Sequence, residues 1–177
     1  FTNTGIRLNS CDFEQSTVNC YNLAPHSQVA SCSFFGGGEN LPQLEVSGSI
    51  SNLFLEDNRF EDHTIGLRLL QSQITAGCNE WIGNEIGVFL DTLSSFNAQS
   101  PFGKNQWLDN GIHIRCQQAN LPLFEAGANT FGAAEDALLL GTLNYPIEGD
   151  LSMNNPPHLV FQNGNMWPNA TLDVALM

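Results

Sequence analysis

Short runs in which apolar and polar residues alternate recur along the chain, and the spacing typical of an amphipathic helix is not sustained anywhere. The clearest pair is Gly66–Leu69 (GLRL) and Gly87–Leu90 (GVFL). Apolar residues at every second position predict a short strand with one buried face. Comparable runs occupy 5–8, 111–114 and 137–140, which predicts these inward side chains: Ile6, Leu8, Leu67, Leu69, Val88, Leu90, Ile112, Ile114, Leu138 and Leu140.

A second motif precedes most of these runs: an asparagine or cysteine, any residue, and then an aromatic residue. Its successive copies are 21, 26, 21, 26, 24 and 36 residues apart. A recurrence at this period indicates a structural repeat. The seven copies are Cys11/Phe13, Cys32/Phe34, Asn58/Phe60, Asn79/Trp81, Asn105/Trp107, Asn129/Phe131 and Asn165/Trp167.

The repeat is too short for a propeller blade, which takes about 40 residues, and it lacks the consensus of leucine-rich repeats. Two or three short strands fit into each unit of 21–26 residues. We therefore predict an all-β parallel β-helix of about seven coils, in which each coil stacks on the previous one. The whole of 1–177 forms one such domain, with an insertion near 141–158 where Pro156 and Pro157 disfavour a central strand.

This repeat resembles the right-handed parallel β-helix of the pectin-lyase-like superfamily, especially its non-catalytic bacterial surface proteins with parallel β-helix repeats. The resemblance extends from Phe1 to about Trp167 and lies in the repeat, without a catalytic signature. It implies a β-solenoid that is secreted or displayed at the cell surface. Because Phe1 occupies the aromatic position of the motif, the sequence also predicts a segment of a longer protein.

Stacked coils would place the first residue of each motif in one column. Asparagine suits such a column because it tolerates the left-handed backbone of a tight turn and its amide bonds to neighbours above and below. Cys11 and Cys32 would be either a disulfide or two adjacent buried thiols. The predicted structural ladder is Cys11, Cys32, Asn58, Asn79, Asn105 and Asn129, beside a column of aromatic side chains stacked in the core.

Alternation along the same strands predicts a mixed outward row of Arg7, Arg68, Phe89, His113 and Leu139. A cation, an aromatic ring and an imidazole on a flat sheet face could bind a glycan or another protein. Arg68, Phe89 and His113 are therefore candidate ligand-binding residues. The alternative is an ordinary solvated face in which a covering segment lies over Phe89 and Leu139.

Acidic residues follow the aromatic positions and outnumber the basic residues along the chain. The chain has 18 acidic and 5 basic residues, with a net charge of −13. This charge disfavours nucleic acid and anionic membranes as partners, and no apolar run approaches the roughly 20 residues of a membrane helix. Glu61, Asp62, Glu85 and Asp109 are candidate calcium ligands, with solvated turn acids as the alternative.

No recognisable catalytic constellation is present. The sequence has no Asp-Asp pair, no Gly-His-Gly and no Gly-x-Ser-x-Gly, and its four histidines lack metal-ligand spacing. We expect a non-enzymatic stalk, adhesin or filament segment of a secreted or cell-surface protein. Its expected partners are flanking parts of its own chain, other copies, or a surface glycan. The alternatives are a polysaccharide lyase or glycoside hydrolase on the same scaffold, and a carbohydrate-binding module.

Overall fold

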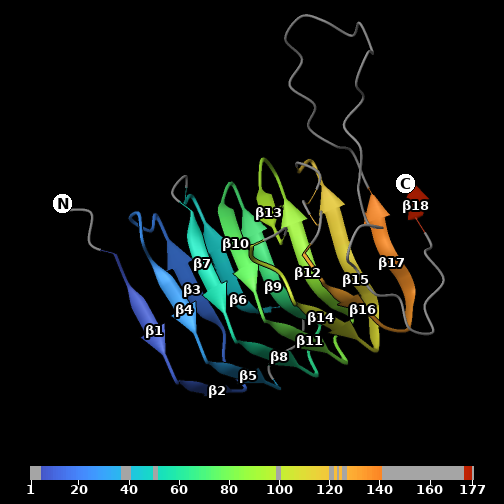
Figure 1. The fold of residues 1–177 in the computed structure, drawn as a ribbon, viewed down its shortest axis with the longest axis horizontal. Helices are drawn as coiled ribbons and strands as arrows, with labels where there is room; N and C mark the ends of the chain where they lie inside the picture. Colours follow the sequence, from blue (N-terminus) through green and yellow to red (C-terminus); the bar gives the residue numbers. More distant parts are fainter. Residues whose placement is uncertain are drawn as a thin grey trace, which may run out of the picture.

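The computed structural model is a parallel β-solenoid in which each coil contributes one strand to each of three sheets (Figure 1). It describes residues 5–36, 41–49, 52–98, 101–119, 122, 124, 127–140 and 174–176. Sheet A contains β1 (Arg7–Asn9), β4 (Gln28–Ala30), β7 (Leu53–Glu56), β10 (Gln73–Gly77) and β13 (Ser95–Asn97).

Sheets B and C complete each coil. Sheet B contains β2 (Asp12–Glu14), β5 (Ser33–Phe35), β8 (Arg59–Glu61), β11 (Glu80–Ile82), β14 (Gln106–Leu108) and β16 (Thr130–Phe131). Sheet C contains β3 (Val18–Tyr21), β6 (Pro42–Ser47), β9 (Ile65–Leu70), β12 (Ile86–Asp91), β15 (Asn110–Gln117), β17 (Ala134–Leu140) and β18 (Val174–Leu176). Neighbouring strands are parallel and come from successive coils, except that β18 pairs with β17 across 141–173.

The predicted fold class is confirmed, whereas the predicted number of coils is wrong for the part of the chain that the structure describes. Five coils are complete, and β16 and β17 begin another. The seventh motif copy, Asn165/Trp167, and the expected insertion at 141–158 lie outside the described residues. The run 5–8 was grouped by its sequence with Gly66–Leu69 and Gly87–Leu90, which lie in sheet C. Arg7 instead lies in β1 of sheet A, where it pairs with Gln28.

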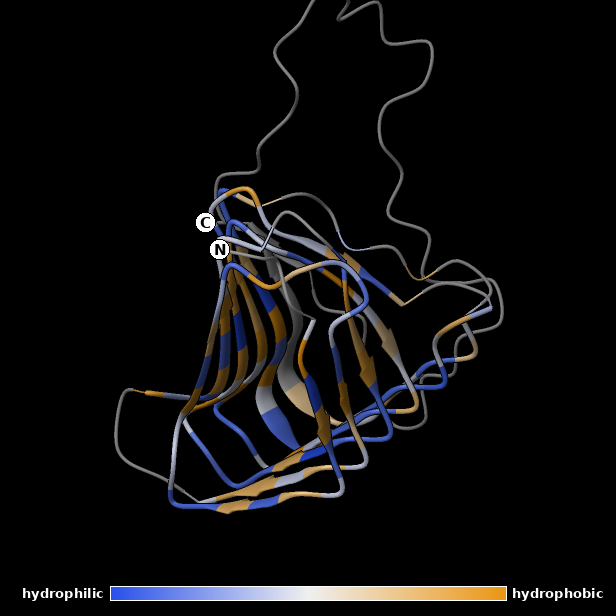
Figure 2. Ribbon diagram, turned by 90° about the vertical axis from the view of Figure 1, so that its left-hand side faces the viewer, coloured by the Kyte–Doolittle hydropathy of each residue, from blue (hydrophilic) through white to orange (hydrophobic). Residues whose placement is uncertain are grey.

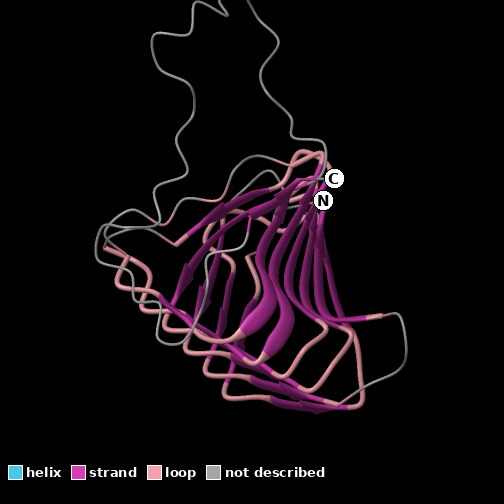
Figure 3. Cartoon of the chain, turned by 90° about the vertical axis from the view of Figure 1, so that its right-hand side faces the viewer, coloured by secondary structure: helices cyan, strands magenta, loops and turns pink. Residues whose placement is uncertain are grey.

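Every coil bends at three corners (Figure 3), and a left-handed backbone conformation recurs at these corners. At least one residue per corner has a positive φ, and most of these residues are not glycine; His26 and Gly103 are additional ones at two of the corners. Left-handed backbone costs an L-residue roughly 1–2 kcal/mol, so other interactions must offset it. The A-to-B corners use Ser10, Ser31, Asp57, Cys78, Lys104 and Ala128; the B-to-C corners use Gln15, Gly36, Asp62, Gly83 and Asp109; the C-to-A corners use Asn22, Gly48, Gln71, Leu93 and Gln118.

A ladder of buried asparagines runs along the A-to-B corner. The Oδ1 atom of Asn79 accepts hydrogen bonds from the backbone N–H of Asn58 at 3.0 Å and from its Nδ2 at 2.9 Å. Asn105 receives the same pair from Asn79, and Asn129 receives it from Asn105. The Nδ2 group of each ladder asparagine also donates to a carbonyl of the previous coil, on its sheet A strand or directly after that strand. The ladder thus links every coil from the third onward to its neighbours.

A second ladder, absent from our sequence prediction, runs along the B-to-C corner. Asn84 donates to the Oδ1 atom of Asn110 through its backbone N–H and its Nδ2, both at 3.0 Å. The backbone N–H of His63 donates in turn to the Oδ1 atom of Asn84 at 3.2 Å. These three residues each lie five positions after an asparagine of the first ladder.

Between the corners, apolar side chains fill the interior. Figure 2 shows the corresponding alternation of hydrophobic and hydrophilic positions along the strands. Six aromatic rings form a continuous stack with centroid separations of 4.7–5.5 Å and interplanar angles of 3–16°. All but the first ring are fully buried, as the sequence predicted for a core column. The rings are Phe13, Phe34, Phe60, Trp81, Trp107 and Phe131.

Candidate functional site

The outward face of sheet C carries a row of charged and aromatic side chains. The strand register places Glu45, Arg68, Phe89 and Arg115 side by side on β6, β9, β12 and β15. The guanidinium carbon of Arg68 lies 5.6 Å from the Phe89 ring centroid, and that of Arg115 lies 5.2 Å from it. Phe89 is therefore flanked by two guanidinium groups, each within cation–π range.

Arg68 is also anchored by two carboxylates. Its Nη2 donates to Asp91 at 2.7 Å, and its Nη1 lies 3.6 Å from Glu45. Burial of Asp91 opposes ionisation, but hydrogen bonds from Arg68 and Thr92 outweigh it and lower the pKa of the Asp91 carboxyl. Arg115, by contrast, forms no ion pair with any residue that the structure describes. The row thus presents one neutralised and one free cation.

His113 does not belong to this row, so its predicted role on the outward face is wrong. Its side chain is completely buried, whereas Arg115 points outward two positions later. The register aligns Ile114 with Val88, which makes His113 equivalent to Gly87 and Gly66. The run 111–114 therefore has the same residue pattern as Gly66–Leu69 and Gly87–Leu90. In the structure, however, the residues equivalent to those two runs are 113–116, two positions later.

Packing against the aromatic stack explains which residue fills this inward position. A Cβ atom on Gly66 would lie 2.9 Å from Trp81 Cδ1, and one on Gly87 would lie 3.1 Å from Trp107 Cδ1. Both would also lie 2.8 Å from a carbonyl oxygen of the next coil. The next ring in the stack after Trp107 is the smaller Phe131, and the ring of His113 packs 6.3 Å from it. Because the ring in the next coil is a phenylalanine here and not a tryptophan, the inward position has room for the imidazole of His113.

The buried imidazole is held by two polar contacts. Its Nε2 lies 2.8 Å from the carbonyl oxygen of Gly132, so Nε2 carries the proton and donates it. Nδ1 then accepts from Nδ2 of Asn110 at 3.2 Å, which extends the second ladder. Burial lowers the pKa of His113, and the hydrogen bond to Gly132 and the charge of Asp109 oppose this shift only in part.

This burial predicts that acid destabilises the solenoid. An unfolded histidine binds a proton near pH 6.5, whereas His113 in the folded state binds one only at lower pH. The free energy of unfolding is therefore highest above about pH 6.5, where the imidazole is neutral in both states. It decreases as the pH falls toward the lower pKa of folded His113. Buried His63, whose pKa burial also lowers, acts in the same direction. We expect urea titrations at pH 7 and pH 5 to show a lower free energy of unfolding at pH 5.

The variant His113→Gln should weaken this pH dependence. The matched control is His26→Gln, because the His26 side chain is exposed. Equal pH dependence in the two variants would contradict the assignment to His113.

The four carboxylates considered for calcium do not converge. Glu61 is paired with Arg59 at 2.9 Å, and Asp62 and Asp109 lie two coils apart in a corner column with Gly83 between them. Glu85 lies two residues beyond that column. Within the described ranges, no group of three or more histidine, cysteine, aspartate or glutamate side chains could hold a metal ion. The calcium hypothesis therefore has no assembled site there.

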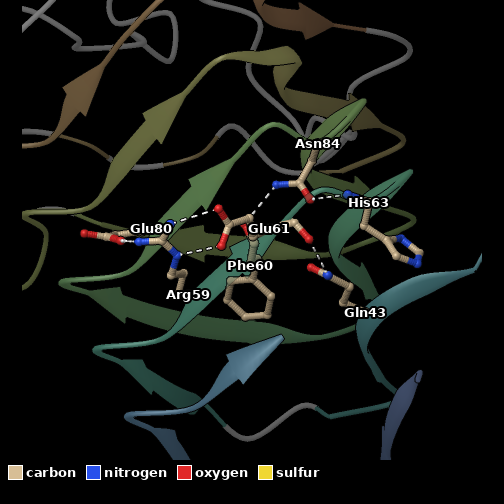
Figure 4. A network of polar contacts seen from close by, with 7 residues as sticks. All are labelled: Gln43, Arg59, Phe60, Glu61, His63, Glu80 and Asn84. Carbon is tan, nitrogen blue, oxygen red and sulfur yellow. Dashed lines mark hydrogen bonds and ion pairs between the residues drawn. The ribbon is translucent and has the colours of Figure 1, made fainter. Parts of the chain in front are cut away.

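Glu61 instead belongs to a polar network on sheet B (Figure 4). Arg59 binds both carboxylate oxygens of Glu61 at 2.9 Å and reaches Glu80 on the next strand at 3.2 Å. The hydrogen bond to Arg59 lowers the pKa of the Glu61 carboxyl, and burial opposes this effect. At the backbone, the carbonyl of Glu61 accepts from Nε2 of buried Gln43 at 2.9 Å. Of these contacts, Arg59 with Glu80 and Gln43 with Glu61 link neighbouring coils.

Cys11 and Cys32 occupy the first two positions of the predicted ladder as free thiols. The Sγ atom of Cys32 donates to the carbonyl of Ala30 at 3.2 Å, and its backbone N–H donates to Oδ1 of Asn58 at 3.1 Å. Burial raises the pKa of the Cys32 thiol. The pair therefore continues the column without a covalent bond.

Among the described residues there is no helix long and apolar enough to cross a membrane. Comparisons of the chain with protein-family models, with curated proteins and with solved structures found no match. The structure shows the parallel solenoid itself, whereas the resemblance to the pectin-lyase-like superfamily stays a prediction from the sequence repeat.

Proposed function

We propose that this solenoid is a load-bearing segment of a secreted or cell-surface protein, such as a stalk, an adhesin or a filament. The observation that carries the proposal is the continuity of its internal columns. The aromatic stack passes through every coil, and two asparagine ladders tie successive coils at separate corners. Such an architecture gains length by adding coils while its cross-section stays the same.

The exposed edges of the first coil favour the proposed partners, which are further coils or another copy of the chain. Among the described residues, β1, β2 and β3 each have a hydrogen-bonded neighbour on one side only. Five core side chains of this coil are also only partly buried: Ile6, Leu8, Cys11, Phe13 and Val18. Open strand edges of this kind can pair with a further strand.

Single-molecule force spectroscopy tests the load-bearing role. The chain would be placed between two reference domains and pulled from its ends. Because each coil contacts only its neighbours, we expect coils to detach one at a time. A coil of 21–26 residues would release roughly 70–90 Å of chain at about 3.3–3.6 Å per residue. Extension without measurable resistance would contradict the proposal, as would release of unsaturated or reducing products from pectin or polygalacturonate.

Glycan binding by sheet C is the second candidate, favoured by the free cation of Arg115 beside Phe89. Because guanidinium groups flank the Phe89 ring, the geometry favours hydrogen bonds and charge over stacking of a sugar on that ring. If this face binds glycans, Phe89→Ala should abolish retention on an immobilised acidic polysaccharide, because it removes the ring against which the unpaired Arg115 is positioned. Tyr21→Ala, which alters an exposed ring elsewhere on the sheet, should retain binding. Equal retention of the two variants would exclude this face.

A further inference from the structure

A separate hollow lies on the outer face of sheet A, next to the corner that leads to sheet B. Its volume is about 140 Å³, and its lining includes Phe54, Glu56, Thr75, Gly77, Phe102 and Lys104. The longer connection between β13 and β14 supplies Pro101, Phe102, Gly103 and Lys104. This site lies on a different sheet from the row of Arg68 and Phe89.

Two glycines of neighbouring coils, Gly77 and Gly103, line the hollow and are joined by a parallel bridge. Gly103 is required by the fold, because its φ is +107° and a Cβ there would collide with the carbonyl of Gly127. Gly77 is not required in this way. A Cβ on Gly77 would come no closer than 3.7 Å to any neighbouring atom, so a side chain could be accommodated and would fill the hollow.

The walls combine aromatic and charged groups. The rings of Phe54 and Phe102 lie 6.1 Å apart at 52°, and Phe102 is 41% exposed. Glu56 is exposed and its Oε2 accepts from Nε2 of Gln28 at 3.2 Å. Lys104 is also exposed, and it forms no ion pair within the described part of the chain. The hollow therefore offers a partly exposed aromatic ring, together with a carboxylate and an ammonium that are not paired with each other.

We propose that this hollow binds one neutral sugar ring. The C–H face of a pyranose matches an exposed aromatic ring, while its hydroxyl groups donate to a carboxylate and accept from an ammonium. Small-ligand sites combine an apolar lining with a few polar groups, and the small volume of about 140 Å³ restricts the ligand to a single ring. Because Glu56 and Lys104 carry opposite charges, the site favours neither an anion nor a cation. The inference does not depend on the load-bearing role.

The test is a titration of the ¹⁵N-labelled protein with methyl glucoside, methyl galactoside and methyl mannoside, followed by NMR. We expect at least one glycoside to shift the amide signals of Gly77, Cys78 and Gly103, with a dissociation constant near the millimolar range. Gly77→Val should weaken binding at least tenfold by filling the hollow. Gln73→Val is the matched control, because Gln73 is exposed on the same strand and outer face, and it should leave the shifts unchanged.

The variant Phe102→Ala provides a second test at an exposed side chain, should Gly77→Val fail to fold, and it should also weaken binding at least tenfold. The proposal is overturned if none of the three glycosides shifts these signals at about 50 mM, well above the expected range. It is equally overturned if binding survives Phe102→Ala, or if glycine, used as a zwitterionic probe, shifts the same amides as strongly as the glycosides.

Discussion

Replacing Asn79 by alanine should lower the free energy of unfolding by about 3–5 kcal/mol, because several buried polar groups lose their partner at once. The Oδ1 atom of Asn79 accepts from the backbone N–H and the Nδ2 of Asn58. Its Nδ2 donates to the carbonyl of Leu55 and to Oδ1 of Asn105, both at 3.0 Å. None of these groups can turn to water without opening the corner. Urea denaturation of the variant and the parent chain measures the difference.

The matched control is Asn9→Ala, since Asn9 is exposed on β1 and its replacement should cost no more than about 0.5 kcal/mol. If the two asparagine variants lose similar stability, the hydrogen bonds of the ladder do not stabilise the solenoid. An unchanged midpoint for Asn79→Ala would be the clearest contradiction.

Replacing Phe34 by alanine should cost about 3–5 kcal/mol, as is usual when a fully buried aromatic side chain is removed. Its ring stacks between Phe13 at 4.9 Å and Phe60 at 4.7 Å, and the residue is 1% exposed. The adjacent residue, Phe35, points to the opposite side of β5 and is 38% exposed. Phe35→Ala should therefore cost about 1 kcal/mol or less, although the same atoms are deleted.

This pair of variants compares two sequence neighbours with identical chemistry, so the difference between them reports the direction of the side chains. Thermal or urea unfolding of both gives that difference directly. A larger loss for Phe35→Ala than for Phe34→Ala would reverse the inward face of β5 and contradict the register.

The repeated structure could be predicted because its strongest constraints are local. Asn58, Asn79 and Asn105 each precede a strand whose second residue is a buried aromatic, and this combination survives changes in coil length. Extra residues are accommodated elsewhere, for example at 98–104 between β13 and β14. Counting from the ladder asparagine is therefore reliable through sheets B and C.

The outward position predicted for His113 was wrong because it rested on residue type and not on the number of positions after the ladder asparagine. Gly66, Gly87 and His113 each lie eight positions after a ladder asparagine, yet the glycine at position 111 suggested a different alignment. The same count would have revealed Asn84 and Asn110 as a second ladder. A histidine at an inward position carries no such signal, because its burial depends on the size of the ring in the next coil, Phe131.

The hollow on sheet A had no counterpart in the sequence prediction. It depends on the path of the connection through Pro101 and Phe102, which no periodicity describes. It also depends on the conformation of Gly103, which pairs with Gly77 from the preceding coil. Sites built from irregular connections on a regular scaffold are in general harder to infer than the scaffold itself.

Nuclear Overhauser effects between strands of successive coils test the central claim most directly. The register aligns Phe60 with Trp81 and Trp81 with Trp107, and neighbouring strands lie about 4.8 Å apart. We therefore expect contacts between the backbone protons of these residues, although they are 21 and 26 positions apart in the chain. Their absence in a folded sample, or contacts that instead join antiparallel neighbours, would contradict the stacking of one coil on the next.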